Sequence, residues 1–560
     1  MIVKSIRIHN FRTFDDGEIT LCPYSSLVGA NNSGKTNIID ALRVFYEKDL
    51  KYQESRDFPK FEVAGREVWV EIEYLPSTEE FQSLKDEYKL ANSTFRVRKY
   101  FQSSEKDAEG KLKSGIYAYT GGSLSDSRFY GAKNVQQGKL GDIIYIPAVS
   151  KLDETTKLTG PSPLRDLLNS VVKRVMENSA SYASLKESFE AFEKGIKNES
   201  TSDGQSLARL EKDITKEISD WGTRFELTIG AVSPDDLVKG LVDHRIFDSD
   251  LGVCQESKCY GQGFQRHLIF TLIRLAAKYT SEKPTPSRKE FSPEMSVILF
   301  EEPEAFLHPA QIAVLDQSIR TLTKSPGTQV LISTHNPLFV SRSIQDLPSL
   351  TRLHRDGAKA RPYRVSEEQL ANIIFLNQDA LKAWVASGIL LSEDDLTTEM
   401  ETLKYSLWLD SRRCAGFFAN RILLVEGQTE VALFDYLINS GQIKVPREGV
   451  FIFDSLGKFN IHRFMNLFAS LGIPHSVLYD DDNGKNAIVS STIQNAKNGL
   501  TIGIDSFPKD IEDFLGIPPA DKPHKKPQHV MYQVAQGKVS ADRMDELCTK
   551  VAKVLSLDNG

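Results

Sequence analysis

The stretch "SSLVGANNSGKTNIIDAL", residues 25–42, decides the fold, because it reads as a short buried strand, a glycine-bounded loop and an amphipathic helix. The loop carries the pattern G-x-x-x-x-G-K-T. Backbone N–H groups of such a loop curl around phosphates, and the following helix adds the positive end of its dipole. The lysine reaches the β- and γ-phosphates and the threonine binds Mg²⁺. We therefore expect a nucleoside triphosphate to bind at Gly29, Asn32, Gly34, Lys35 and Thr36.

Two later segments have the pattern of further strands of the same site. In "VILFEEPE", residues 297–304, four apolar residues precede two acids at the carboxyl end of a strand, where open α/β sheets bind their ligands. Glu301 is expected to hold Mg²⁺, directly or through water, and Glu302 to polarise the attacking water. "VLISTHNP", residues 330–337, ends a buried strand with His335, which is expected to reach the γ-phosphate. A solvated acidic loop and a structural histidine are the ordinary alternatives, and the order of the three segments favours the nucleotide site.

A second set of acids follows strands near the C-terminus. "RILLVEGQTEVALFDYL", from residue 421, places Glu426 at the end of a strand and Glu430 one helical turn later, so that both can face one point. "HSVLYDDDNG", from residue 475, ends a second strand in three aspartates. In an extended chain Asp480 and Asp482 would point the same way. Four converging carboxylates repel one another and raise their pKa values, and Mg²⁺ or Mn²⁺ removes that cost. Such centres carry out metal-assisted phosphoryl chemistry.

Three nearby segments extend this prediction. "FDSLGKFNI" places Asp454 at a strand end, and "KDIEDFLGI" offers Glu512 beside an apolar helix. The basic segment "KPHKKPQHV" contains Lys525 and Lys526, either of which could sit on a scissile phosphate, although a solvated lysine run is an equal alternative. We take Lys526 as the candidate catalytic lysine. The predicted metal ligands of this centre are Glu426, Glu430, Asp454, Asp480, Asp482 and Glu512.

Composition limits the class of protein. The chain has 560 residues, 40% of them hydrophobic and 26% charged, as in an ordinary soluble globular protein. Its net charge of −7 argues against a generally basic nucleic-acid coat but leaves room for a local basic groove. Five scattered cysteines indicate free thiols rather than a disulfide framework. With no signal peptide and no run of about 20 apolar residues, we expect a cytoplasmic protein without a membrane association.

Sequence patterns also divide the chain. Residues 1–160 and 245–365 form the predicted nucleotide-binding domain, and residues 161–244, with apolar residues at helical spacing, form a helical insertion. The mixed charged stretch 366–418 is expected to be a linker. Residues 419–560 form a second α/β unit.

The first domain resembles the ABC-type ATPases of the RecF, SMC and Rad50 kind, whose first strand and Asn-Phe-Arg turn look like "IRIHNFRTF". In that class two heads sandwich ATP, and a signature loop of the partner head touches the γ-phosphate. The candidate loop here is "YGQGFQRHLIFTLIRLA", in which Gly263 and Gln265 would supply the donors. It departs from the Leu-Ser-Gly-Gly-Gln form, which suggests slow ATP turnover.

E-G-x-x-E followed by D-x-D resembles a Toprim domain, and an ABC-type ATPase joined to a Toprim domain resembles the OLD (overcoming lysogenisation defect) family of nucleases. The resemblance implies an α/β fold: an ATPase head with a helical insertion, then a Toprim domain. It also implies a homodimer or higher oligomer joined through the insertion, metal-dependent DNA nicking or cutting, and a role in defence against phage. ATP would control cutting rather than supply its energy, and we expect bound ATP to restrain cutting. The partner would be a helicase, a retron reverse transcriptase with its DNA, or none.

Two other classes of protein stay open at this point. One is a RecF-like DNA-binding ATPase clamp in which the Toprim domain is a scaffold, and the intact set of acids speaks against it. The other is a topoisomerase or primase, which is weaker because the chain shows neither a transesterifying tyrosine domain nor a zinc-ribbon module.

Overall fold

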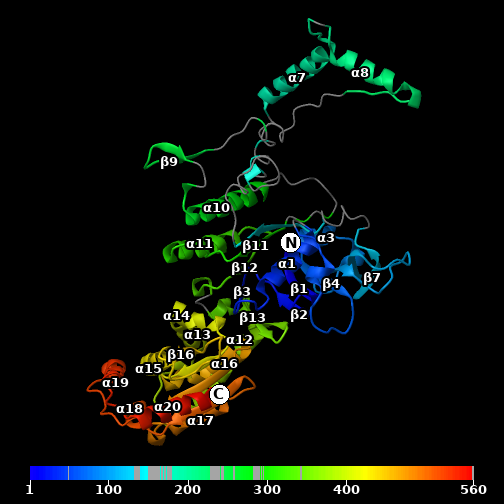
Figure 1. Cartoon of the computed structure of the whole chain (residues 1–560). Helices are drawn as coiled ribbons and strands as arrows, with labels where there is room; N and C mark the ends of the chain where they lie inside the picture. Colours follow the sequence, from blue (N-terminus) through cyan, green and yellow to red (C-terminus); the bar gives the residue numbers. More distant parts are fainter. Residues whose placement is uncertain are drawn as a thin grey trace. The chain divides into compact units, whose positions relative to one another are not determined.

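The protein divides into two compact units, residues 1–148 with 288–560, and residues 149–287. The computed structural model (Figure 1) describes residues 1–47, 50–130, 139–148, 164–165, 168, 172, 179–202, 204–227, 240, 245–255, 259–281, 291, 293, 295–340 and 344–557. Three sheets with flanking helices form the first unit, which confirms the predicted α/β fold class.

An antiparallel sheet begins the first unit. Its strand order is β2-β1-β4-β5-β6-β7. The strands are β1 (Ile2–Phe11), β2 (Phe14–Thr20), β4 (Val68–Leu75), β5 (Phe95–Gln102), β6 (Gly115–Thr120) and β7 (Ser123–Arg128). Apolar side chains of β1 and β4 pack against helix α1 (Lys35–Tyr46) in one core. The short helices α2 (Glu54–Asp57) and α3 (Thr78–Ser83) lie in the connections.

The second sheet brings the three predicted nucleotide-site strands side by side. Its order is β14-β13-β3-β12-β11-β8. The strands are β3 (Tyr24–Val28), β8 (Asp142–Ile146), β11 (Ser296–Glu301), β12 (Thr328–Ser333), β13 (Leu350–Asp356) and β14 (Lys359–Arg364). Helix α11 (Pro309–Leu322) connects β11 to β12. Because β3, β12 and β11 run parallel, the residues that follow them meet at one edge of the sheet.

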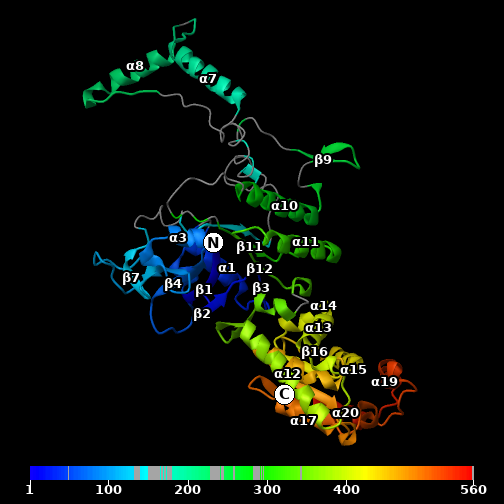
Figure 2. The same cartoon turned by 180° about the vertical axis from the view of Figure 1, so that it is seen from behind.

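A four-stranded parallel sheet forms the C-terminal region, residues 419–557, in the order β16-β15-β17-β18. The strands are β15 (Ile422–Val425), β16 (Phe451–Asp454), β17 (His475–Asp480) and β18 (Thr501–Phe507). The helices are α15 (Gln428–Asn439), α16 (Ile461–Ser470), α17 (Ala487–Asn495), α18 (Ile511–Leu515), α19 (Lys526–Ala535) and α20 (Ala541–Val554). These helices cover both faces (Figures 1 and 2), and the central strand β15 is apolar on both sides.

Residues 366–418, expected to be a linker, are instead a folded helical part of the first unit. They form α12 (Glu367–Ala386), α13 (Thr398–Trp408) and α14 (Ser411–Cys414). Apolar residues at helical spacing, Leu370, Ile373, Trp384 and Tyr405 among them, are buried, while most charged residues between them face solvent. Glu401 is buried as well, in an ion pair with Arg463 at 2.6 Å. The charged composition of the stretch obscured this amphipathic pattern.

The second unit contains the predicted insertion and extends beyond it. It includes α7 (Ala180–Asn198), α8 (Leu207–Glu217), β9 (Ile246–Asp248), β10 (Val253–Gln255) and α10 (Gln262–Ser281). Residues 245–287, predicted as part of the ATPase domain, therefore group with the insertion. The helix predicted from the spacing of residues 164–175 lies largely outside the described residues. Among all the helices that the structure describes, none combines the length and apolarity needed to cross a membrane.

Candidate functional sites

Most of the predicted nucleotide residues line one cavity of about 260 Å³ at the carboxyl edge of the second sheet; Gly29, Gly263 and Gln265 are not among its lining residues. Its lining includes Asn32 and Gly34 from the loop after β3, Lys35 and Thr36 at the start of α1, Glu301 at the end of β11 with Glu302 directly after it, and His335 after β12. Gly29 stands at the start of the loop. A side chain there would put its Cβ 2.2 Å from the carbonyl oxygen of Leu353, at a φ of +134°, so the close passage of β13 requires glycine.

Lys35 is buried at the floor of this cavity. Its Nζ donates hydrogen bonds to the carbonyl oxygens of Gly29 and Ala30, each at 2.9 Å. Burial lowers the pKa of Lys35 to about 8, against the opposing charges of Glu302 and Glu304. A bound triphosphate would supply stronger acceptors than these carbonyls and would favour the charged ammonium.

The acids after β11 organise the polar edge of the cavity. Glu301 accepts a hydrogen bond from the Tyr145 hydroxyl at 2.6 Å. Glu302 adopts a left-handed backbone conformation, with φ of +42°, as the chain turns out of the strand. Glu304, which the sequence reasoning did not single out, accepts hydrogen bonds from the Thr334 hydroxyl at 2.9 Å and the His335 N–H at 2.7 Å. It thereby ties the β11 loop to the β12 loop.

His335 lies in this cavity with a pKa below its ordinary value. Burial is the main cause, and the charge of Lys35 adds to it while Glu302 opposes it. The neutral imidazole can therefore donate or accept a hydrogen bond at a bound phosphate.

Gly263 and Gln265 belong to the first turn of α10, in the second unit. The side-chain amide of Gln265 donates to the carbonyl oxygen of Tyr260 at 2.8 Å and helps to close the start of the helix. The position of this turn at the head of a helix is consistent with a phosphate-facing loop, and its role stays a prediction.

A carboxylate centre, defined here as Glu426, Glu430 and Asp480, lies at the carboxyl edge of the C-terminal sheet. Glu426 directly follows β15, and its Oε1 accepts a hydrogen bond from the backbone N–H of Asp480 at 2.8 Å. Glu430, on the first turn of α15, accepts from the Gly427 N–H at 3.1 Å. Within the described residues, Asp480 Oδ1 is buried without a hydrogen-bond partner.

The three acids hold an excess of buried negative charge. Burial, then repulsion from Asp480, raises the pKa of Glu426 to about 8. The same two causes raise the pKa of Glu430 to about 7, and burial raises that of Asp480 to about 6. A hard divalent cation fits this set because it binds carboxylate oxygens and removes their repulsion.

The donor set is open rather than a closed cage. In the part of the chain that the structure describes, no group of three or more His, Cys, Asp or Glu side chains is arranged to hold a metal ion by itself. Mg²⁺ is commonly bound by one or two carboxylates together with waters and substrate phosphates. The orphaned Asp480 oxygen and the raised pKa values therefore fit an ion whose coordination a substrate phosphate completes.

Lys526, rather than its exposed neighbour Lys525, lies at the carboxylate centre. Its Nζ is 3.2 Å from Asp480 Oδ2 and 3.5 Å from Glu512 Oε2. Burial acts to lower the pKa of Lys526, but Asp480, Glu430 and Glu512 together raise it, so the ammonium stays charged. The other oxygen of Glu512 accepts a hydrogen bond from the Ala520 N–H at 2.9 Å, which fixes this carboxylate beside the lysine.

Asp482 does not share the direction of Asp480. The chain leaves the extended conformation after β17, and Asp482 has a left-handed φ of +53°. Its side chain is exposed, and its Oδ2 lies 3.7 Å from Lys458 Nζ. The expectation of an extended D-x-D pair was therefore wrong, because the turn that follows the strand rotates the third aspartate outward.

Asp454, predicted as a metal ligand, already has partners on both carboxylate oxygens. Oδ2 lies 3.1 Å from the Arg413 guanidinium and also accepts a hydrogen bond from the Gln428 amide. Oδ1 accepts from the Leu456 N–H at 2.8 Å. This arrangement suits a residue that orders the loop after β16 better than one that ligates an ion.

Two further residues, Asp510 and Lys458, lie beside the carboxylate centre and were not among the predicted site residues. Asp510 caps α18 through a hydrogen bond from the Asp513 N–H at 2.8 Å, and its charge contributes to the raised pKa of Asp480. Lys458 is buried beside the aspartates that follow β17. In the sequence, the Gly-Lys turn of "FDSLGKFNI" is the signal that indicates this lysine.

Arg352 connects the nucleotide loop with the C-terminal region. It lies on β13, paired with Val28, the residue before Gly29. The fully buried guanidinium donates hydrogen bonds to backbone carbonyls that lead into β15 and β17; they belong to Phe417 (3.2 Å), Ala419 (2.7 Å), Leu471 (3.3 Å) and Gly472 (2.9 Å). Burial lowers the pKa of Arg352 to about 10.

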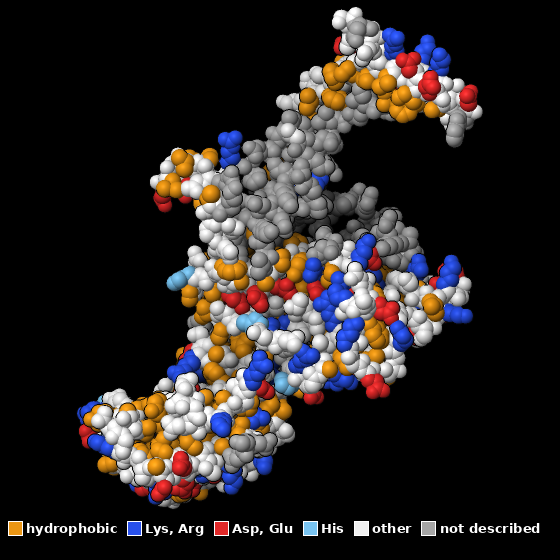
Figure 3. Space-filling model, in the orientation of Figure 1, with side chains coloured by type: hydrophobic (Ala, Val, Ile, Leu, Met, Phe, Trp, Pro, Cys, Tyr) orange, Lys and Arg blue, Asp and Glu red, His pale blue; other side chains and the backbone are white. Residues whose placement is uncertain are grey.

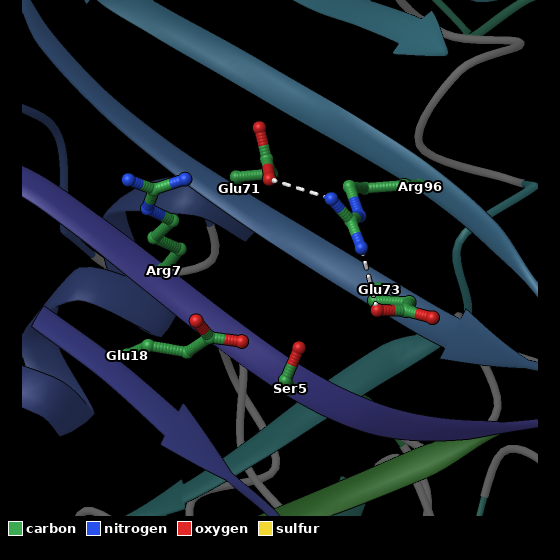
Figure 4. A pocket seen from close by; sticks show the side chains of 6 residues that line it. All are labelled: Ser5, Arg7, Glu18, Glu71, Glu73 and Arg96. Carbon is green, nitrogen blue, oxygen red and sulfur yellow. Dashed lines mark hydrogen bonds and ion pairs between the residues drawn. The ribbon is translucent and has the colours of Figure 1, made fainter. Parts of the chain in front are cut away.

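A second cavity, of about 110 Å³, lies on the antiparallel sheet (Figure 4). Ser5, Arg7, Glu18, Glu71, Glu73 and Arg96 line it. Glu71 and Glu73 are paired with Arg96, which lies 2.9 Å from Glu73 and 3.7 Å from Glu71. Because these charges already have partners within the cavity, we assign no ligand to it.

Two family models match the chain. The model described as "Overcoming lysogenization defect protein-like, TOPRIM domain" matches residues 417–482. The model described as "AAA ATPase domain" matches residues 1–220 and 164–340, which together exceed half of the chain.

Three relatives are similar over most of the length. The Old nuclease of Escherichia phage P2 is 23% identical over 498 residues, covering 86% of this chain and 77% of that protein. Endonuclease GajA of Bacillus cereus is 23% identical over 499 residues, covering 86% and 75%. The OLD nuclease of Thermus scotoductus is 20% identical over 493 residues, covering 86% and 82%.

Proposed function

Because this chain belongs to the OLD family, in which an ABC-type ATPase domain is joined to a Toprim domain, we propose that it is a divalent-metal-dependent DNA endonuclease regulated by ATP. The observation that carries the proposal is the carboxylate centre with its charged lysine. Glu430 and Asp480 are buried, Glu426 and Lys526 are partly buried, and the three acids have raised pKa values. This arrangement is costly for a purely structural role and suits metal-assisted phosphodiester hydrolysis.

The residues at and beside the carboxylate centre would have separate roles. Glu426, Glu430 and Asp480 would hold Mg²⁺ or Mn²⁺, which when bound lowers the pKa of a water nucleophile and polarises the phosphate. Lys526, held by Asp480 and Glu512, would bind a non-bridging oxygen of the scissile phosphate and stabilise its growing charge. Asp454, anchored by Arg413, would fix the loop that borders Glu426.

We propose that ATP acts on cutting through binding rather than through hydrolysis. The carboxylate centre needs no energy from ATP, because metal-assisted hydrolysis is carried by its own groups. Nucleotide can influence cutting by preferring one of two arrangements of the protein. Arg352 offers a physical link, since a movement of β3 and β13 would be transmitted to the carbonyls that lead into β15 and β17. We propose that ATP binding slows DNA cutting.

Supercoiled plasmid incubated with the protein and Mg²⁺ or Mn²⁺ tests the nuclease directly. Nicked or linear product is expected. Relaxed closed circles would instead indicate a topoisomerase, and intact supercoiled plasmid would indicate a DNA-binding ATPase clamp. Repeating the reaction with ATP and with a non-hydrolysable analogue tests the regulation. Both nucleotides should slow cutting equally, and an effect of ATP without one of the analogue would contradict it.

We also propose a homo-oligomer joined through the second unit, with a role in defence against phage. Leu185 on α7, Phe192 on the same helix and Leu210 on α8 are 44%, 52% and 50% exposed, and Figure 3 shows apolar side chains along both helices. Such exposure of large apolar side chains favours an interface between copies. Light scattering of the Phe192→Asp variant should show a smaller assembly than that of the wild type, and an unchanged mass would contradict the interface. Plating of phage on cells with and without the protein tests the defence role, in which a helicase or a retron reverse transcriptase with its DNA could take part.

A further inference from the structure

Lys458 is a buried cation that lacks a good partner. Its side chain is 4% exposed, and within the described residues its Nζ makes no hydrogen bond. The nearest carboxylate oxygens belong to Asp482, at 3.7 Å, and Asp481, at 3.9 Å. The ammonium also lies 5.2 Å from the centre of the Tyr479 ring. Burying an ammonium without hydrogen bonds is costly, so its retention at this place calls for a ligand.

The loop that carries Lys458 is fixed and holds a second unused donor. Its first residue, Asp454, is held by Arg413, and the Gly457 N–H donates to the carbonyl oxygen of Glu426 at 2.7 Å. Ser455, in the same loop, is fully buried, and in the part of the chain that is described its hydroxyl has no hydrogen-bond partner. The loop thus places two unmet donors next to the backbone of a predicted metal ligand.

Lys458 and Lys526 lie on opposite faces of the C-terminal sheet. Side chains of β17 alternate, so that Tyr479 packs in the apolar cluster of α16 and Leu478 in the cluster of α19. Lys458 contacts the Tyr479 ring at the start of α16, whereas Lys526 begins α19. The carboxyl ends of β15 and β17, with Glu426 and Asp480, lie between the two faces.

We propose that Lys458 binds a backbone phosphate of the DNA next to the scissile phosphate, with the Ser455 hydroxyl as a second donor. This inference rests on the proposed nuclease function, in which Lys526 holds the scissile phosphate. A DNA strand that crosses the carboxyl edge of the C-terminal sheet would pass Lys526 on one face of the sheet and Lys458 on the other. Phosphate oxygens would supply the hydrogen bonds that the Lys458 ammonium lacks, and the contact would be independent of base sequence.

Salt-dependent DNA binding tests the proposal apart from cutting. Affinity of the wild type and of Lys458→Met for a short duplex is measured by fluorescence anisotropy in Ca²⁺, across 50 to 200 mM salt. Loss of one charge-assisted phosphate contact should weaken binding by about tenfold or more at low salt. The slope of log affinity against log salt should fall by about 0.9 for one lost phosphate contact. Lys497→Met is the matched control, because Lys497 is exposed and follows α17 at the opposite, amino-terminal edge of the sheet.

The outcomes separate this inference from the proposed function. If the wild-type protein cuts DNA but Lys458→Met has the same affinity and the same salt slope as the wild type, the phosphate role of Lys458 is overturned. Absence of cutting by the wild type instead refutes the nuclease. The melting temperature of Lys458→Met shows whether the variant folds. An apolar methionine at this buried site should leave the melting temperature unchanged or raise it. If Lys458→Met does not fold, Lys458→Gln and Ser455→Ala are measured in its place, and wild-type salt slopes in both overturn the proposal.

Discussion

Replacement of Glu426 by glutamine should stabilise the metal-free protein, and the gain should depend strongly on pH. The pKa of Glu426 is raised from 4.5 to about 8 in the folded protein, chiefly by burial and by Asp480. A tenfold change in proton affinity corresponds to about 1.4 kcal/mol, so the anion costs the fold about 4 kcal/mol at pH 8 and under about 1 kcal/mol at pH 5. Glutamine keeps the shape and removes the charge.

The direction of the pH dependence follows from the raised pKa of Glu426. A carboxyl whose folded pKa exceeds its unfolded value stabilises the fold when protonated and loses that contribution as pH rises from 4.5 through about 8. The stability difference between Glu426→Gln and the wild type should therefore grow by about 3 kcal/mol between pH 5 and pH 8. Glu430 and Asp480 titrate within the same window, so the wild type itself should weaken as pH rises.

Urea unfolding in EDTA, followed by tryptophan fluorescence, measures this difference because Trp384 and Trp408 pack against helices of the C-terminal region. Mg²⁺ should then stabilise the wild type more than Glu426→Gln at pH 8, and much less at pH 5, because it binds the charged carboxylates. A Glu426→Gln variant that is no more stable than the wild type at pH 8, or a gain equal at both pH values, would refute the reasoning.

Three further predictions concern the nucleotide loop and its link to the cutting centre. Lys35→Ala should weaken ATP binding by about tenfold or more, since it removes a charge-assisted contact worth about 1.5–3 kcal/mol; unchanged affinity in calorimetry would contradict this. Gly29→Ala should destabilise the protein and abolish nucleotide binding, because its Cβ would lie 2.2 Å from the Leu353 carbonyl oxygen. Gly65→Ala is its control, since among the described residues no atom lies within 4 Å of the added carbon. Arg352→Met should lower the free energy of unfolding by about 3 kcal/mol, as buried carbonyls lose their donor, and should make cutting insensitive to ATP; retained ATP control would exclude this link.

That the predicted nucleotide residues lie close together could be derived from sequence, because they are local to three strand ends. Gly29–Thr36, Glu301 and His335 each follow a run of apolar residues, and parallel pairing of β3, β12 and β11 brings such ends together. The same logic located Glu426, Glu430 and Asp480. The basic segment indicated two candidate lysines, and the start of α19 places Lys526 rather than Lys525 beside Asp480; its catalytic role stays a prediction.

Other features depend on contacts that no short pattern encodes. The outward turn of Asp482 follows from a left-handed residue after β17, and the partners of Asp454 come from α14 and α15. Lys458 belongs to a helix start, where a lysine ordinarily faces solvent, and the packing of α16 on β17 buries it. The four carbonyls bound by Arg352 lie 65 to 120 residues away along the chain.

The central claim is that the carboxylate centre cuts DNA while the nucleotide site controls it. The most direct test compares plasmid cleavage by the wild type, Asp480→Asn and Glu302→Gln, with Mn²⁺ and with ATP binding measured in parallel. Asp480→Asn should lose cutting and keep ATP binding, whereas Glu302→Gln should lose ATP turnover and keep both cutting and its response to ATP. Full cutting by Asp480→Asn, or loss of cutting in Glu302→Gln, would contradict the account.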